Sequence, residues 1–163
     1  MDTLSVAAFL VPAAVLGVGL IAIWTPTPLY GGLGIIVVGY VARYATVGIR
    51  AVAAAMAQSN PNLEQAAAAF GGSYLRRMTR IVVPLHRRGV GGAWLMTFVF
   101  CLRDLETVVT FYPPGRETLP IRIFTLEANG PPEVVAALAV LHVGLTAAVL
   151  ALGGCLLWKK RWA

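Results

Sequence analysis

The residues best suited to binding or chemistry are charged side chains inside an otherwise apolar stretch. Arg103, Asp104 and Glu106 lie in the outer third of the run 89–110. If this run is a helix, Arg103 and Glu106 share one face because they are three positions apart. Such charges either line a watery cavity or form a structural pair near the outer headgroups, and both interpretations stay open. Together with Arg122 they form a candidate translocation path, in which Arg103 and Arg122 are suited to an anionic substrate or its receptor.

The chain shows no recognisable catalytic or metal-binding set. His86 and His142 lack ligand spacing with each other or with Cys101 and Cys155. It has no phosphate-binding Gly-x-x-x-x-Gly-Lys-Ser/Thr loop, and its only lysines lie at 159–160. We therefore expect no enzymatic activity and no cofactor or metal bound by this chain.

The composition indicates that lipid surrounds the elements that carry these residues. Of 163 residues 58% are hydrophobic and 12% charged, against about 45–50% and about 25% in soluble domains. The mean hydropathy is +0.77, and a chain of this size has little interior in which to bury so much apolar surface. We interpret the net charge of +6 as a signal of membrane orientation and of attraction to anionic lipid, not to nucleic acid.

Apolar runs predict an all-α, polytopic membrane protein with one domain, 1–163, and about four spans. The predicted spans cover approximately 4–24, 31–50, 89–110 and 134–158. Thr-Pro-Thr-Pro at 25–28 predicts a tight hairpin after the first span. The second helix should begin near residues 29–33 and continue to about Gln58.

Basic residues predict the orientation. Ten basic residues fall on one side of the membrane, because they lie either between the end of span two and the start of span three or after span four. They are Arg43, Arg50, Arg76, Arg77, Arg80, Arg87, Arg88, Lys159, Lys160 and Arg161. Because positive charge concentrates on the cytoplasmic side, we expect both termini and the loop 58–88 to be cytoplasmic. The loop 111–133, rich in proline near its start, is then a periplasmic cap.

The cytoplasmic loop carries helix signals. Asn60 can cap a helix, and Gly71-Gly72 can end it. Ser73 can cap a second helix that Pro84 stops, with basic and apolar residues that suit a membrane surface.

The spacing in this loop resembles the EAA signature of the permeases of bacterial ABC importers. That signature is Glu-Ala-Ala, three residues, glycine, nine residues, isoleucine, one residue, Leu-Pro. The matching residues here are Gln65, Ala66, Ala67, Gly71, Ile81 and Pro84, with Glu64 just before them. Gln65 replaces the signature glutamate and Val83 the leucine. The first departure bears on coupling strength, because an amide cannot copy the contacts of a charged group.

The resemblance implies a bacterial inner-membrane subunit whose loop docks on a separate ATPase that binds ATP and Mg. It also implies a second permease copy or half and a periplasmic solute-binding protein as partners, besides membrane lipids. The run 102–130 is similar to iron(III)-type permeases and their relatives for thiamine or phosphonates. Such a permease core usually has at least five spans, so we expect a truncated product, a misplaced start or part of a longer permease. The alternative is a non-transporting membrane scaffold or assembly protein, or an inactive remnant.

Overall fold

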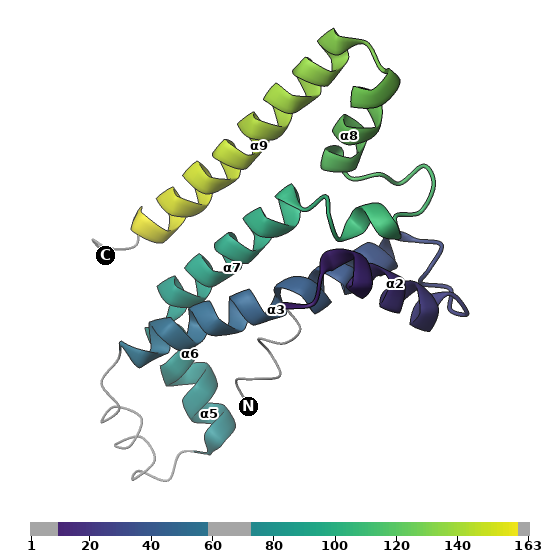
Figure 1. Ribbon diagram of the computed structural model, residues 1–163. Coiled ribbons are helices and arrows are strands. Elements are labelled where there is room, and N and C mark those ends of the chain that lie inside the picture. The colour runs from purple at the N-terminus through teal and green to yellow at the C-terminus, as the bar shows by residue number, and fades with distance from the viewer. Residues whose placement is uncertain (1–9, 59–72, 160–163) are drawn as a thin grey trace.

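The structure is a computed structural model that describes residues 10–58 and 73–159, and this part of the chain is helical without a strand (Figure 1). The all-α prediction is confirmed for these residues. The elements are α2 (Ala13–Trp24), α3 (Leu33–Ala57), α5 (Tyr74–Arg77), the π-helix η1 (Met78–Val82), α6 (Val83–Leu85), α7 (Arg87–Arg103), the 3-10 helix η2 (Val108–Thr110), α8 (Leu119–Asn129) and α9 (Pro132–Lys159).

Three long helices form the body of the molecule. The central helix, α7, packs against α3 on one side and α9 on the other, and the three axes run side by side in Figure 1. At one end, α2 lies against the start of α3 and α8 against the start of α9. The segment α5–η1–α6 extends from the other end, where α7 begins. The segment α5–η1–α6 and the charged residues 103–106 therefore lie at opposite ends of α7.

Two of the described helices are long and apolar enough to cross a membrane. They are Leu33–Ala57 and Pro132–Leu157. The 12 residues of α2 span about 18 Å and the 17 of α7 about 25 Å, both short of a hydrocarbon core about 30 Å thick. Two of the four predicted spans thus correspond to helices that are long enough to cross a membrane, and the other two spans remain a prediction.

The start of the first apolar helix differs from the prediction. The prediction of one helix through 4–24 is wrong at Pro12. The backbone of Pro12 is not helical, and α2 begins at the next residue, Ala13. Proline cannot donate an N–H within the helix and crowds the preceding turn. The carbonyl of Val11, left free at this break, accepts a hydrogen bond from Arg43 Nη1.

The helix α3 matches the prediction at both ends, since it follows the turns at 25–31 and ends at Ala57 with Gln58 as its C-cap. Arg43, however, lies near the middle of α3 and not close to the end of a span. It therefore carries less weight as an orientation signal than the arginines at 50 and beyond.

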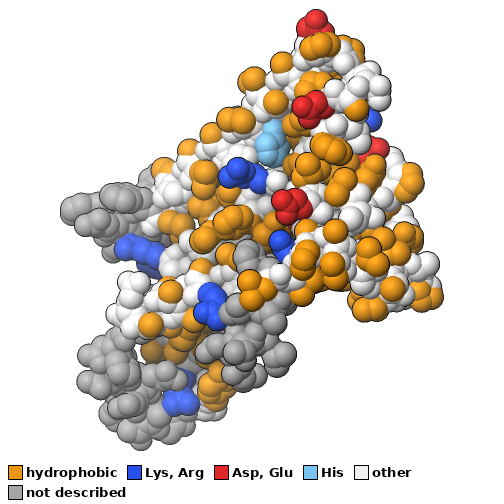
Figure 2. Space-filling model, viewed as in Figure 1, with side chains coloured by type: hydrophobic (Ala, Val, Ile, Leu, Met, Phe, Trp, Pro, Cys, Tyr) orange, Lys and Arg blue, Asp and Glu red, His pale blue; other side chains and the backbone are white. Residues whose placement is uncertain are grey.

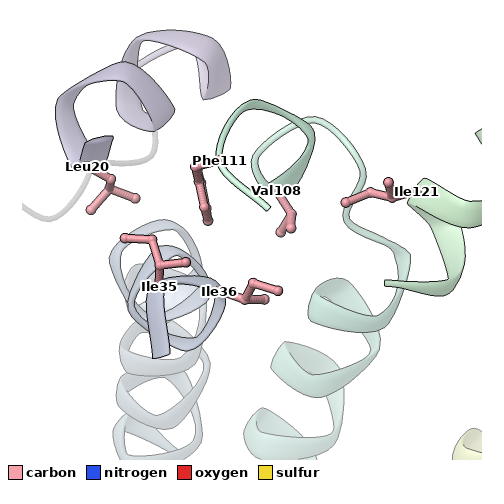
Figure 3. Packing of buried hydrophobic residues seen from close by; sticks show 6 residues of the cluster. All are labelled: Leu20, Ile35, Ile36, Val108, Phe111 and Ile121. Carbon is pink, nitrogen blue, oxygen red and sulfur yellow. The ribbon is translucent and has the colours of Figure 1, made fainter. Parts of the chain in front are cut away.

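The buried core lies at the end where α7 finishes. Its side chains are Leu20, Ile35, Ile36, Val108, Phe111 and Ile121. Figure 3 shows these side chains converging from α2, α3, the turn around η2, and α8. The core thus fixes the segment after α7 against the α2–α3 hairpin, and so fixes the position of the charged residues in that segment.

Candidate functional site

The described half of the loop 58–88 is one nearly continuous helical arm. Ser73 occupies the N-cap position of α5 with extended backbone, as predicted, although its side chain makes no capping hydrogen bond. The elements α5, η1 and α6 then follow one another without an intervening loop. The predicted coupling residues Glu64, Gln65, Ala66, Ala67 and Gly71 lie outside the described residues.

The prediction that Pro84 stops this helix is wrong. The helical backbone continues through Pro84 to Leu85. Proline lacks an N–H and its ring crowds the carbonyl four residues earlier, but η1 relieves both conflicts. The Val83 N–H donates to the Met78 carbonyl, five residues back, so the turn before Pro84 is wider than an α-turn. Pro84 then lies in the first turn of α6, where a missing donor is tolerated.

The arm exposes a mixed apolar and basic surface. Val82 is buried, whereas Tyr74, Leu75 and Ile81 are exposed, Leu75 by 73%. Arg80 is exposed on the same arm. Exposed apolar side chains flanked by positive charge are typical of a surface that meets a partner protein or a membrane.

His86 joins the arm to α7. Its backbone N–H donates to the Val82 carbonyl at 3.0 Å, and its ring Nδ1 lies 2.8 Å from the same oxygen. His86 is also the N-cap of α7, and α6 contacts α7 directly. The arm is therefore joined to the central helix by a short, hydrogen-bonded connection.

At the other end, α7 stops earlier than the sequence suggests. It ends at Arg103, and Asp104 has extended backbone. Arg103 and Glu106 consequently do not share a helix face, and that prediction is wrong. Both side chains are exposed, and among the described residues no ion pair joins them to each other or to Arg122.

Asp104 is the buried member of the predicted translocation path, with 5% of its surface exposed. Its Oδ1 accepts a hydrogen bond of 3.0 Å from the Thr107 N–H. An aspartate in this position satisfies a free N–H at the start of a helical turn, here the turn that leads into η2. Its Oδ2 is buried and has no hydrogen-bond partner of good geometry in the described part of the chain.

Two tyrosines that sequence reasoning missed lie near this carboxylate. Tyr40 and Tyr44, one turn apart on α3, both interact electrostatically with Asp104. The ring of Tyr44 also stacks on Phe100 of α7, with centroids 5.9 Å apart. Their four-residue spacing was the available signal, but the sequence does not say which helix faces them.

The helix α8 was also missed, because prolines at 113, 114 and 120 suggested an irregular cap. Thr118 and Leu119-Pro120 are typical of a helix start, and Gly130-Pro131 of its end. Arg122 projects from the first turns of α8 and is exposed, whereas the neighbouring Ile121 is fully buried in the core. The core therefore holds Arg122 at the surface of the end that carries Arg103 and Glu106.

Comparison with known proteins agrees with the resemblance seen in the loop. No family model matches the chain. It is 26% identical over 138 residues to PhnV of Salmonella paratyphi A, a permease protein assigned to 2-aminoethylphosphonate transport, covering 83% of this chain and 52% of that protein. It is 31% identical over 111 residues to the ferric transport system permease protein FbpB of Actinobacillus pleuropneumoniae, covering 67% and 16%.

A third relative is the spermidine/putrescine transport system permease protein PotC of Haemophilus influenzae. The identity is 34% over 90 residues, covering 54% of this chain and 34% of that protein. The chain thus spans about half the length of PhnV and smaller shares of the other two. The relatives name different solutes but the same kind of component, and they place this chain in the family of ABC-importer permeases.

Proposed function

We propose that this chain is the transmembrane permease subunit of an ABC importer, in which the loop 58–88 docks on a separate ATPase subunit. The observation that carries the proposal is the complete set of signature offsets from Gln65 to Pro84. These offsets lie between two helices of a chain related to transport permeases. ATP and Mg would be bound by that ATPase and not by this chain, whose sequence has no phosphate-binding loop.

The described arm supports a mechanical role for the loop. It runs from Ser73 into α6, is joined to α7 at His86, and α7 in turn packs against both α3 and α9. A displacement of the loop by the ATPase changes the position of α7 relative to its two neighbours. That biases the membrane helices between two arrangements, as the alternation of a transporter requires.

In the membrane we propose four spans with both termini and the loop 58–88 in the cytoplasm. The two candidate spans, α3 and α9, carry the clearest support. The shorter α7 packs between them and is covered on two sides, so less of its surface needs to match the lipid. The segment 111–133, with α8, then lies on the periplasmic side.

The solute we propose is iron(III) or a related solute, delivered by a periplasmic binding protein to a permease dimer or pseudo-dimer. The ferric and phosphonate permeases among the relatives support this class. Arg103 and Arg122 are exposed at the proposed periplasmic end, where a guanidinium can bind an anionic group of the solute or its receptor. With a cationic solute, such as iron(III) or the polyamines named for PotC, the two arginines would contact an acidic group of the binding protein and not the solute itself.

The test is co-purification of the tagged chain with an ABC ATPase subunit from its native cells. Gly71→Val should release the ATPase while the chain still inserts into the membrane, whereas Gly144→Val on an open face of α9 should leave binding intact. A scaffold that only grips lipid predicts the reverse. In that case Gly71→Val has no effect, and Arg77→Gln with Arg80→Gln weakens the binding of the loop to anionic lipid.

A further inference from the structure

The start of α7 and the end of α9 lie side by side. The two helices are antiparallel and tightly packed, because a Cβ placed on Gly91 would lie 2.6 Å from Leu157 Cδ2, and one on Gly153 the same distance from Leu95 Cδ1. Gly91 thus pairs with Leu157 one turn after α7 begins, and Gly153 with Leu95 one turn further along. This packing holds the first residues of α7 at a fixed level beside the last turns of α9.

A cavity of about 320 Å³ opens at this junction. It is lined by Arg87 and Arg88 from α7 and by Leu156 and Leu157 from α9. Both arginines are exposed, and Leu156 is 70% exposed. Two of its four lining residues are therefore cationic and two aliphatic, and each pair comes from a different helix.

Among the described residues, the charge around the cavity is of one sign. The acidic residues in the described part of the chain are Asp104, Glu106, Glu117, Glu127 and Glu133. All of them lie between the end of α7 and the start of α9, at the far end of the helix pair. Figure 2 shows the red side chains toward the end of α7, α8 and the start of α9, whereas blue side chains occur toward both ends of this face. An anion at the cavity thus meets no nearby carboxylate from these residues.

The level of the cavity is that of a membrane surface. The candidate span on α9 ends at Leu157, which itself lines the cavity. A ligand there has its polar part beside the arginines and its apolar part beside residues that face the hydrocarbon. Guanidinium groups bind phosphate through paired hydrogen bonds, whereas leucine side chains favour an acyl chain.

We propose that the junction of α7 and α9 is a binding site for one anionic phospholipid, with its phosphate at Arg87 and Arg88 and an acyl chain along Leu156 and Leu157. The inference needs α9 to cross the membrane but does not depend on transport or on an ATPase. The lipid would fix the start of α7 against the end of α9, next to the arm that enters α7 at His86.

The test uses the full chain purified in detergent and exposed to equal amounts of phosphatidylglycerol and phosphatidylcholine, with bound lipid counted by native mass spectrometry. We expect phosphatidylglycerol to be retained preferentially. Losing one charged hydrogen-bond partner weakens binding about tenfold, so Arg87→Gln should reduce that retention by about this factor. Arg116→Gln, which also removes one exposed arginine but at the far end, should not.

Two further measurements test whether the bound ligand is a lipid or a soluble anion. The first uses a variant in the apolar part of the site, so the result does not depend on Arg87→Gln alone. Leu156→Asn should also lower phosphatidylglycerol retention, since it disturbs only the apolar half of the site. Inorganic phosphate at millimolar concentration should not displace the lipid. Equal retention of both lipids, equal effects of Arg87→Gln and Arg116→Gln, or displacement by inorganic phosphate would each overturn the proposal.

Discussion

The ring of Phe111 lies directly against the backbone of Gly39 in the middle of the first half of α3. A Cβ on Gly39 would approach the tip of the ring and would lie 3.1 Å from its Cε2 atom. Phe111 is itself 4% exposed and belongs to the core that joins α2, α3, η2 and α8. Contact between this glycine and this ring thus sets how closely the segment after α7 can approach α3.

Gly39→Ala should therefore destabilise the protein. The added methyl group forces the ring or the helix to move, which costs about 1–3 kcal/mol for an overpacked core. Thermal unfolding in detergent measures the effect. The matched control is Gly144→Ala on α9, where a Cβ would meet no atom within 4 Å and the change should be neutral or stabilising by up to about 1 kcal/mol. Equal melting temperatures for the two variants would show that Phe111 does not limit the spacing.

Asp104 allows a second prediction, because its described hydrogen bond needs an oxygen but not a charge. Asp104→Ala removes the acceptor of the Thr107 N–H and should cost about 0.5–2 kcal/mol, as the loss of a helix cap does. Asp104→Asn keeps an oxygen in place and should cost clearly less. Glu106→Ala, at an exposed neighbouring position, should change stability by less than about 0.5 kcal/mol. If the asparagine variant is as unstable as the alanine variant, the charge of Asp104 matters more than its cap.

The proposed orientation predicts which exposed residues can be labelled from outside the cell. In a background of Cys101→Ala and Cys155→Ala, we expect Glu117→Cys to react with a membrane-impermeant maleimide in intact cells. Thr79→Cys should react only after the membrane is permeabilised. Both side chains are exposed in the structure, so protection by folding does not explain a difference. Labelling of position 79 in intact cells would place the arm in the periplasm and remove the basis of the coupling proposal.

The sequence was a good guide where local chemistry determines the backbone. The turns at 25–31 and the end of α3 at Ala57 follow from Thr-Pro-Thr-Pro and from Ser-Asn-Pro at 59–61, whose preferences act over a few residues. The start of α2 at Ala13 could have been predicted in the same way, since Pro12 was present in the apolar run. Hydropathy alone hid that signal, because proline does not interrupt an apolar pattern.

The sequence was a poor guide where distant segments decide. The run 89–110 reads as one apolar helix, yet α7 ends at Arg103 because the following residues bury Thr107, Val108 and Phe111 against α2 and α3. That change of direction separates Arg103 from Glu106 and turns Asp104 inward. No periodicity within the run contains this information, since the surface that attracts these side chains lies more than 70 residues earlier, around Ile35.

The π-helix gives the last prediction, which concerns how the arm is aimed. The wide turn at η1 exists next to a proline that could not fit an ordinary α-helix. In Pro84→Ala the position regains an N–H and loses the ring, so η1 should revert toward α-helical hydrogen bonding. One residue more or less in a turn rotates everything before it by about 100°, and the exposed Tyr74 and Leu75 would then face a different direction from α7.

Hydrogen–deuterium exchange over residues 78–83 should detect the new bonding pattern in Pro84→Ala, and ATP hydrolysis by the co-purified ATPase should become uncoupled from transport. The matched control, Pro114→Ala, removes an exposed proline from a loop at the other end and should leave both measurements unchanged. An altered exchange pattern with normal coupling would mean that the ATPase does not use this face of the arm. An unaltered pattern would mean that η1 is stabilised by the contacts of Val82 and His86, which are independent of the proline ring.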